Sequence, residues 1–170
     1  AADYLGFRHP DLMKHSLAPT TQAGRIAVLL PSLQGGGAER SMLNLAKGFL
    51  SHGRTVDLVL CQAKGAYLAE IPVGATMIEL QATGELQARC SAALGNRRDF
   101  FALLRPVLLA TKIAPEILRL RSLQHYLETY RPDVILSALT YANLVAIWAK
   151  HMSGSNVPVV VSERIALSTY

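Results

Sequence analysis

The feature that most constrains the fold of this chain is a strand–turn–helix–strand unit in residues 26–60. Residues 26–30 are an uninterrupted apolar run closed by Pro31, which is typical of a strand buried on both faces of a parallel sheet. After a glycine turn, apolar residues recur with helical spacing, and we expect an inward stripe of Met42, Leu45, Ala46 and Phe49, widened by Leu43 and Leu50. Gly53 is placed to end this helix, and an apolar strand follows at 55–60. The unit predicts a right-handed βαβ crossover.

The rest of the chain repeats this alternation. Further strands are predicted at 75–80, 134–136 and 157–161. Helices are predicted at 100–110, 116–130 and 141–152, and a loop is expected over 81–98. Five strands with intervening helices indicate an α/β fold: a doubly wound parallel sheet of the Rossmann-like type, in three layers, with strand order 3-2-1-4-5.

Two of these helices carry more specific expectations. Pro115 is expected at the first position of the helix 116–130, and the apolar stripe of that helix includes Tyr130. The turns at 131–133 and at Gly154 are expected to end the two helices. In the helix 141–152, the residues expected to face inward are Leu144, Val145, Ile147 and Trp148.

Composition and charge narrow the class of protein. The chain has 170 residues, of which 51% are hydrophobic, so it can bury one sizeable core. Its net charge of +5 favours approach to anions such as nucleic acid, an acidic membrane face or phosphorylated small molecules. Because the basic residues are scattered and Trp148 is the only tryptophan, we do not expect a nucleic-acid groove.

The cysteines and histidines predict neither a disulfide scaffold nor a metal site. Cys61 and Cys90 are not closely paired, which favours a reduced, cytoplasmic compartment, and the five histidines lack ligand spacing. Residues 1–23 have no signal-peptide apolar core, and no segment is long enough to span a membrane. We therefore expect an N-terminal arm at 1–23 and one Rossmann-like domain over 24–170.

The segments after the first, fourth and fifth strands are the expected ligand-binding positions. In a doubly wound sheet, ligands bind beyond the carboxyl ends of the strands, here residues 31–38, 137–143 and 162–168. Gly35, Gly36 and Gly37 allow a tight turn and close approach of the main chain to a ligand, and the N–H groups of the next helix attract phosphate. The competing interpretation is a tight strand-to-helix turn without a ligand.

Several common motifs are missing. Residues 35–39 do not spell G-x-G-x-x-G, and the second strand ends without an acidic residue for an NAD ribose, which disfavours a dehydrogenase. Neither a P-loop nor a G-x-S-x-G nucleophile motif is present, and no D-x-D pair points to a metal-dependent sugar transferase.

The remaining motifs resemble group 1 (family 4) glycosyltransferases, in order and in spacing. The segments that carry the resemblance are 31–40 (PSLQGGGAER), 43–46 (LNLA), 131–137 (RPDVILS), Ala142-Asn143 and 158–164 (PVVVSER). The resemblance implies the N-terminal, acceptor-side domain of a retaining GT-B hexosyltransferase. It further implies a nucleotide-sugar donor, a glycan or lipid-linked acceptor, a role in cell-surface polysaccharide synthesis, and no metal or other cofactor.

The resemblance also assigns roles to residues. It places Gly35, Gly36 and Gly37 opposite the donor diphosphate and the acceptor. It makes Glu163 the candidate catalytic carboxylate, and it places the acceptor beside Ser162, Arg164, Thr140 and Asn143. The competing interpretations are an ion pair between Glu163 and Arg164, an N-cap threonine and a surface asparagine. The donor-binding domain is expected outside the chain, so residues 1–170 alone should be inactive.

Two further functions stay open. The apolar residues of 97–112 are flanked by basic residues, so this segment is either a peripheral membrane contact at the inner face of the membrane or a helix packed on the sheet. The second open alternative is that the domain is a nucleotide-binding Rossmann module without transferase activity.

Overall fold

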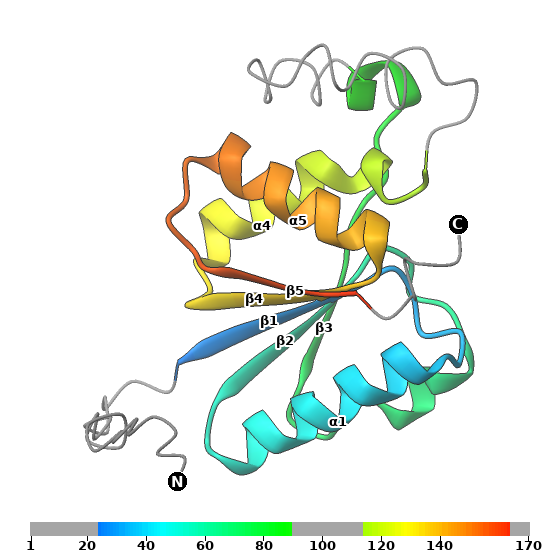
Figure 1. The fold of residues 1–170 in the computed structure, drawn as a ribbon, viewed down its shortest axis with the longest axis vertical. Coiled ribbons are helices and arrows are strands. Elements are labelled where there is room, and N and C mark those ends of the chain that lie inside the picture. The colour runs from blue at the N-terminus through cyan, green and yellow to red at the C-terminus, as the bar shows by residue number, and fades with distance from the viewer. Residues whose placement is uncertain (1–23, 90–113, 164–170) are drawn as a thin grey trace, which may run out of the picture.

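The computed structural model describes residues 24–89 and 114–163, which form a five-stranded parallel sheet (Figure 1). The strand order is β3-β2-β1-β4-β5, and every neighbouring pair is parallel, as the sequence predicts. The predicted strand bounds agree to within two residues. The strands are β1 (Arg25–Leu30), β2 (Thr55–Leu60), β3 (Thr76–Glu79), β4 (Val134–Ala138) and β5 (Val159–Ser162).

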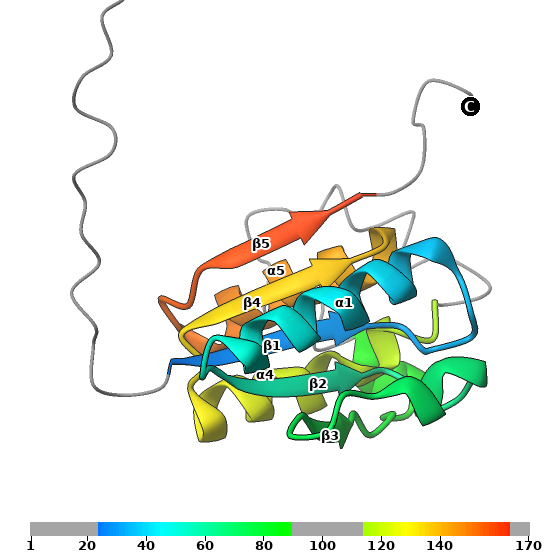
Figure 2. The ribbon, with the colours of Figure 1, turned by 90° about the horizontal axis from the view of Figure 1, so that it is seen from below.

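Helices cover both faces of the sheet and make the expected three layers. The helix α1 (Gly37–Ser51) and the short 3₁₀ helix η1 (Ala66–Glu70) pack on one face. The 3₁₀ turn η4 (Ile117–Arg119), α4 (Leu120–Tyr130) and α5 (Thr140–Ser153) pack on the other. Figure 2 shows α1 lying across one face of the sheet, with α4 and α5 on the opposite face. Residues 85–89 are helical, while the predicted helix 100–110 lies outside the described residues.

The central strand β1 contributes to both cores because its side chains alternate between the two faces. Ala27 and Leu29 pack with α4 and α5, whereas Val28 and Leu30 pack with α1. All four side chains are almost completely buried. This double burial explains why the sequence of β1 is a continuous apolar run and not an alternating one.

One buried carboxylate joins the sheet to α4 at the amino end of the strands. Asp57 of β2 is 1% exposed, and its Oδ2 accepts hydrogen bonds from Tyr126 Oη at 2.7 Å and from Arg25 Nη1 at 3.1 Å. The Arg25 guanidinium also lies over the ring of Tyr130, 5.6 Å from its centre. Burial, reinforced by the hydrogen bond to Asp57, raises the pKa of Tyr126 above its ordinary value.

The predicted inward face of α1 is partly wrong. Met42, Leu43 and Ala46 are buried as expected, but Leu45 is 41% exposed. Leu43 packs in the core between α1 and the sheet, whereas Leu45 lines a hollow beside Ile26 and Val134.

The inward face of α5 also differs from the prediction. Val145 and Trp148 are buried, but Leu144 and Ile147 are 36% and 38% exposed. The inward positions are taken largely by small side chains, namely Ala142, Ala146 and Ala149. Because α5 packs against both the sheet and α4, small residues allow the close approach, and the larger aliphatic residues point outward.

The helix 116–130 begins later than predicted. Pro115 is not its first residue, because the chain first makes the 3₁₀ turn η4 and becomes α-helical at Leu120. Tyr130 is 47% exposed, and Tyr126 is buried in its place. The predicted ends are confirmed, with left-handed residues at Arg131 (φ 45°), Gly154 (φ 63°) and, after α1, Gly53 (φ 71°).

Candidate functional site

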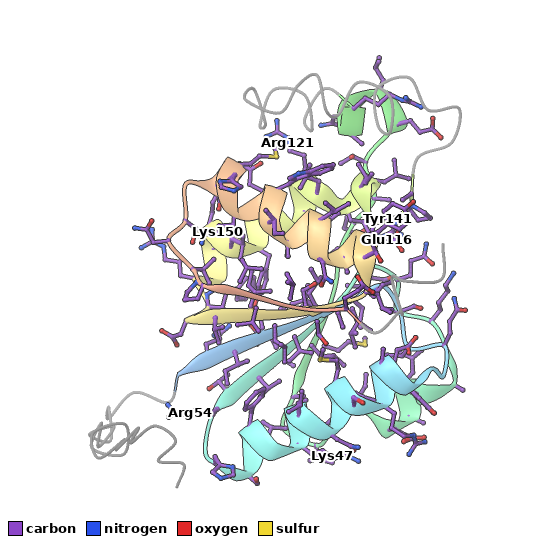
Figure 3. All side chains as sticks on the ribbon, viewed as in Figure 1. Lys47, Arg54, Glu116, Arg121, Tyr141 and Lys150 are labelled. Atoms are coloured by element: carbon purple, nitrogen blue, oxygen red, sulfur yellow. The ribbon has the colours of Figure 1, made fainter. Side chains whose placement is uncertain are left out.

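A crevice of about 350 Å³ lies at the carboxyl ends of β1 and β4, between which the sheet changes its winding direction. Ligands of doubly wound folds bind at this topological position. Figure 3 labels Glu116 and Tyr141 near this end of α5. The crevice is lined by residues from four segments: Pro31, Ser32, Gln34, Glu39, Glu116, Leu139, Thr140 and Tyr141.

The glycine loop is held firmly by the segment that follows β2. Leu33 N donates to Lys64 O at 2.9 Å, and Tyr67 N donates to Leu33 O at 3.0 Å. Gly65 has φ +123°, and a β-carbon there would collide with the Leu33 carbonyl. These hydrogen bonds and this close packing hold the backbone at Leu33 in place. Gly35, with φ +122°, is exposed, and a β-carbon there would meet no other atom.

A second contact fixes the first turn of α1 to η1. Arg40 Nε donates to Tyr67 Oη at 3.2 Å, and Arg40 Nη2 pairs with Glu70 Oε1 at 3.3 Å. The guanidinium also stacks over the Tyr67 ring, 4.7 Å from its centre. The Arg40 side chain therefore contacts η1, and it is not among the residues that line the crevice.

Glu39 lies in the first turn of α1 with its side chain folded back toward the glycine loop. The residue is 9% exposed, and a β-carbon on Gly36 would collide with its carboxylate. A carboxylate at the N-terminus of a helix is stabilised by the helix dipole. Sequence reasoning missed Glu39 as a crevice residue, although its place three residues after Gly36 is a recognisable helix N-terminal signal.

The turn after β4 is strained. Leu139 precedes α5 with φ +76° and ψ 143°, a conformation that residues other than glycine rarely adopt. No side chain caps α5, so the interpretation of Thr140 as an N-cap is wrong. Thr140 Oγ1 instead donates to Glu163 Oε2 at 3.0 Å, which ties the end of β5 to the crevice wall.

Asn143 and Ser162 form the neighbouring link between α5 and β5. Asn143 Nδ2 donates to Ser162 O at 3.2 Å, and Leu139 N donates to the same carbonyl at 3.2 Å. Asn143 is 8% exposed, so the interpretation as a surface asparagine is wrong. Its Oδ1 is buried without a hydrogen-bond partner among the described residues, as is Ser137 Oγ of β4.

The structure brings most of the predicted site residues to one edge of the sheet. Thr140 lines the crevice, and Glu163, Ser162 and Asn143 adjoin it through the bonds above. Gly35, Gly36 and Gly37 border the crevice without lining it. Arg164 and the segment 97–112 lie outside the described residues, so neither the proposed ion pair nor the membrane contact is tested.

Glu116 is a crevice residue outside the predicted ligand-binding segments, and Tyr141 lies inside the predicted segment 137–143 without having been singled out. Glu116 belongs to no recognisable motif. Its position after Pro115 predicted only the start of a helix. Tyr141 is 52% exposed, and an exposed tyrosine at a helix start has no distinctive spacing. Glu116 reaches the crevice because the start of η4 lies beside α5 in the tertiary fold.

Within the described residues, we looked for two other features, a metal site and a membrane-spanning helix. No group of three or more potential metal-binding side chains occurs within residues 24–89 and 114–163. In the same ranges, no helix is long and apolar enough to cross a membrane. A larger hollow of about 900 Å³ lies at the opposite end of the sheet, near Gly24, Arg54 and Asp133, away from the carboxyl ends of the strands.

Comparison with known proteins identifies the fold. No protein-family model and no curated protein sequence matches the chain. The chain superposes on a crystal structure of MurG from Acinetobacter baumannii with a TM-score of 0.50 and 14% identity, covering 82% of this chain and 35% of MurG. The fold is therefore the Rossmann-like α/β fold of a GT-B glycosyltransferase domain.

Two weaker matches accompany it. A glycotransferase of kitacinnamycin matches at a TM-score of 0.49 and 17% identity, with 84% of this chain and 30% of that chain covered. The structure of apo UGT2 from Phytolacca americana matches with a TM-score of 0.45 and 14% identity. This match covers 85% of this chain and 30% of UGT2. The chain thus spans about a third of the length of each of these proteins.

Proposed function

We propose that this chain is the acceptor-side domain of a glycosyltransferase that moves a sugar from a nucleotide-sugar donor to a glycan or lipid-linked acceptor. The observation that carries the proposal is the crevice between β1 and β4, where polar side chains from four segments surround one opening. The fold shared with MurG supports it, and so does the sequence resemblance to group 1 glycosyltransferases. A role in cell-surface polysaccharide synthesis, at the inner face of the membrane, belongs to the same proposal.

In this proposal, Glu163 is the carboxylate that engages the acceptor hydroxyl. Transfer breaks the bond between the anomeric carbon and the donor diphosphate and forms a bond from that carbon to the acceptor oxygen, whose proton must leave. A carboxylate within hydrogen-bond reach accepts that proton or orients the hydroxyl. Thr140 Oγ1 donates to Glu163 Oε2 and so holds this carboxylate beside the crevice wall.

The remaining residues of the β4 and β5 edge support this arrangement. Asn143 holds the Ser162 carbonyl and thereby the start of the loop that carries Glu163. In the proposed enzyme the sugar is a hexose transferred with retention, and the nucleotide-sugar is a substrate, so no metal or cofactor is assigned. Arg164 is assigned to a phosphate or sugar oxygen of the acceptor.

The proposal further assigns donor binding to a separate domain. The chain covers 35% of MurG, and its described residues make a single sheet. We therefore assign residues 24–170 to the acceptor-side domain, with residues 1–23 as an arm. On this assignment, residues 1–170 alone do not transfer sugar.

The test compares residues 1–170 with the complete product of the gene that encodes them. Each protein is incubated with UDP- and GDP-sugars and with glycan or lipid-linked acceptors, and transfer is followed by mass spectrometry. We expect transfer by the complete product and about a 100-fold or greater loss of kcat in Glu163→Gln, as for removal of a catalytic carboxylate. Robust transfer by residues 1–170 refutes the domain assignment, and tight NAD binding refutes the function.

A further inference from the structure

The crevice has a charge pattern that does not suit a phosphate. Its only charged lining residues among the described ones are Glu39 and Glu116, and neither a lysine nor an arginine nor a histidine lines it. A helix N-terminus attracts phosphate, and lysine or arginine side chains strengthen such binding, whereas a nearby carboxylate repels it. Here the N-terminus of α1 is present, but a carboxylate occupies the position in front of it.

Glu39 is both buried and unpaired. Only 9% of the residue is exposed, yet within residues 24–89 and 114–163 no donor makes a hydrogen bond or ion pair with its carboxylate. The dipole of α1 stabilises the charge, but a carboxylate in this environment retains unused acceptor capacity. Because Glu39 lines the crevice, that capacity is available to a ligand that brings hydroxyl donors.

The glycine next to it keeps the carboxylate in place. Gly36 has an extended, unstrained backbone with φ −86°, so its conformation does not require glycine. A β-carbon at this position would collide with the Glu39 carboxylate. The absence of a side chain at Gly36 therefore makes room for Glu39, and not for a phosphate group.

We infer that Glu39 makes this crevice a subsite for the hydroxyl groups of an uncharged sugar and excludes phosphate from the N-terminus of α1. The glycine loop then does not bind the donor diphosphate, contrary to what the family resemblance implies. The hydroxyls of Ser32, Thr140 and Tyr141 complete a lining that can both donate to and accept from a sugar ring. The choice of a sugar as the ligand rests on the proposed function.

Anion binding is the first test, with inorganic pyrophosphate as the probe. Pyrophosphate is titrated calorimetrically into the wild type, Glu39→Gln and Glu128→Gln. Glu128 is exposed on α4, outside the crevice lining, so its variant changes the net charge equally without touching the crevice. We expect Glu39→Gln alone to bind pyrophosphate about tenfold more tightly or better, because one repelling charge is removed at the helix N-terminus.

Neutral sugars are the second probe. Methyl glycosides of glucose, galactose, mannose and N-acetylglucosamine are titrated into the wild type, Glu39→Ala, Gly36→Ala and Gly48→Ala. We expect at least one glycoside to bind the wild type, and about a tenfold loss in Glu39→Ala, since a hydrogen bond to a charged group is removed. Gly36→Ala should weaken binding by displacing the carboxylate, whereas a β-carbon at Gly48 of α1 meets nothing and should leave binding unchanged.

These outcomes separate the inference from the proposed function. Equal pyrophosphate affinity in the three proteins, or wild-type glycoside affinity in Glu39→Ala, overturns the inference, as does failure of every glycoside to bind. If the complete gene product transfers sugar but Glu39→Gln leaves the KM of an uncharged acceptor unchanged, the function stands and the inference fails. If glycoside binding depends on Glu39 but no transfer occurs, the inference stands alone. Far-UV circular dichroism of each variant confirms that it is folded.

Discussion

At the scale of single residues, two glycines of this chain differ sharply in what their missing side chain does. Gly65 combines φ +123° with a backbone carbonyl where its β-carbon would lie, while Gly48 of α1 faces open space. Gly65→Ala should therefore lower the free energy of unfolding by more than about 2 kcal/mol, because both strain and a backbone clash arise. Gly48→Ala should raise it by about 0.5–1 kcal/mol.

Urea unfolding of the two variants measures this difference. Gly53→Ala is the matched control, since Gly53 has φ +71° but an open surrounding. Its loss should be smaller than that of Gly65→Ala because strain acts there without a clash. Equal losses at Gly53 and Gly65 would show that the brace on Leu33 is not tight.

The buried thiol of Cys61 makes stability depend on alkaline pH. Burial, with a smaller contribution from Glu116, raises the pKa of Cys61 from its ordinary 9.0 to about 12. Between these values the unfolded chain releases a proton that the folded chain retains, so the free energy of unfolding falls as pH rises above 9. The fall due to this group approaches about 1.4 kcal/mol per pH unit.

Urea unfolding between pH 8 and pH 10.5 isolates this dependence. Cys61→Ala should be less stable than the wild type at pH 8, because a small cavity opens, but its stability should fall less steeply above pH 9. The two curves should therefore converge as pH rises. Parallel curves would mean that the thiol titrates normally in the folded protein.

The sequence predicts residue roles well where they depend on local chemistry and poorly where they depend on neighbours. Gly53 and Gly154 were identifiable as helix ends because a left-handed residue needs little beyond its own conformation. Asn143 was ambiguous, because its burial depends on the Ser162 carbonyl, which is distant in sequence. Glu39 likewise becomes a crevice residue only when η4 and α5 are placed beside it.

At the scale of elements, the turn between β4 and α5 is where the backbone stores strain. Leu139 adopts φ +76° and ψ 143°, a region suited to glycine. In an ordinary loop or helix, glycine is less stabilising than alanine by about 0.5–1 kcal/mol. At position 139 we expect the reverse order, with Leu139→Gly more stable than Leu139→Ala, since only glycine relieves the strain while both variants lose the leucine side chain.

Thermal and urea unfolding of the two variants decide this order. The same pair of substitutions at Leu68 of η1, where no positive φ is recorded, provides the comparison. There alanine should be the more stable residue. If alanine is also preferred at position 139, the turn is not strained.

The sequence predicted where the strands and helices lie, but it predicted less well which face of each helix is buried. Apolar runs and helical spacing located the strands and helices, because periodicity reflects burial directly. The rotation of α1 and α5 about their axes escaped the same reasoning. Leu45 and Leu144 satisfy a helical stripe as well as the buried residues do, and the helix face that is buried depends on tertiary packing, as in the close packing of α5 on α4.

At the scale of the whole molecule, the strand order followed from the sequence because few topologies satisfy right-handed crossovers with these five strands. The position of the crevice followed as well, since a doubly wound sheet fixes where its winding reverses. The lining was only partly predictable, because Gln34 and Tyr141 lie in the segments expected to bind a ligand, whereas Glu39 and Glu116 lie outside them. The approach of Glu116 to this edge is a property of the tertiary fold and leaves no local pattern in the sequence.

The two hydrophobic cores lie on opposite faces of one sheet, and β1 contributes side chains to both. Trp148, the only tryptophan, is 8% exposed in the core formed with α4 and α5, so its fluorescence reports on that face. Met42 is buried in the opposite core. If the sheet couples the two faces into one cooperative unit, Met42→Ala should lower the free energy of unfolding by about 2–5 kcal/mol when it is measured by Trp148 fluorescence.

The same loss should appear when unfolding is followed by far-UV circular dichroism, because a two-state transition gives coincident curves for different probes. Leu45→Ala is the control, since Leu45 lies on the same helix but is 41% exposed, and its effect should be clearly smaller. A Met42→Ala transition that shifts by circular dichroism while the Trp148 curve stays in place would contradict the coupling. The α1 layer would then unfold independently, and the crevice wall formed by Glu39 would loosen without the rest of the fold.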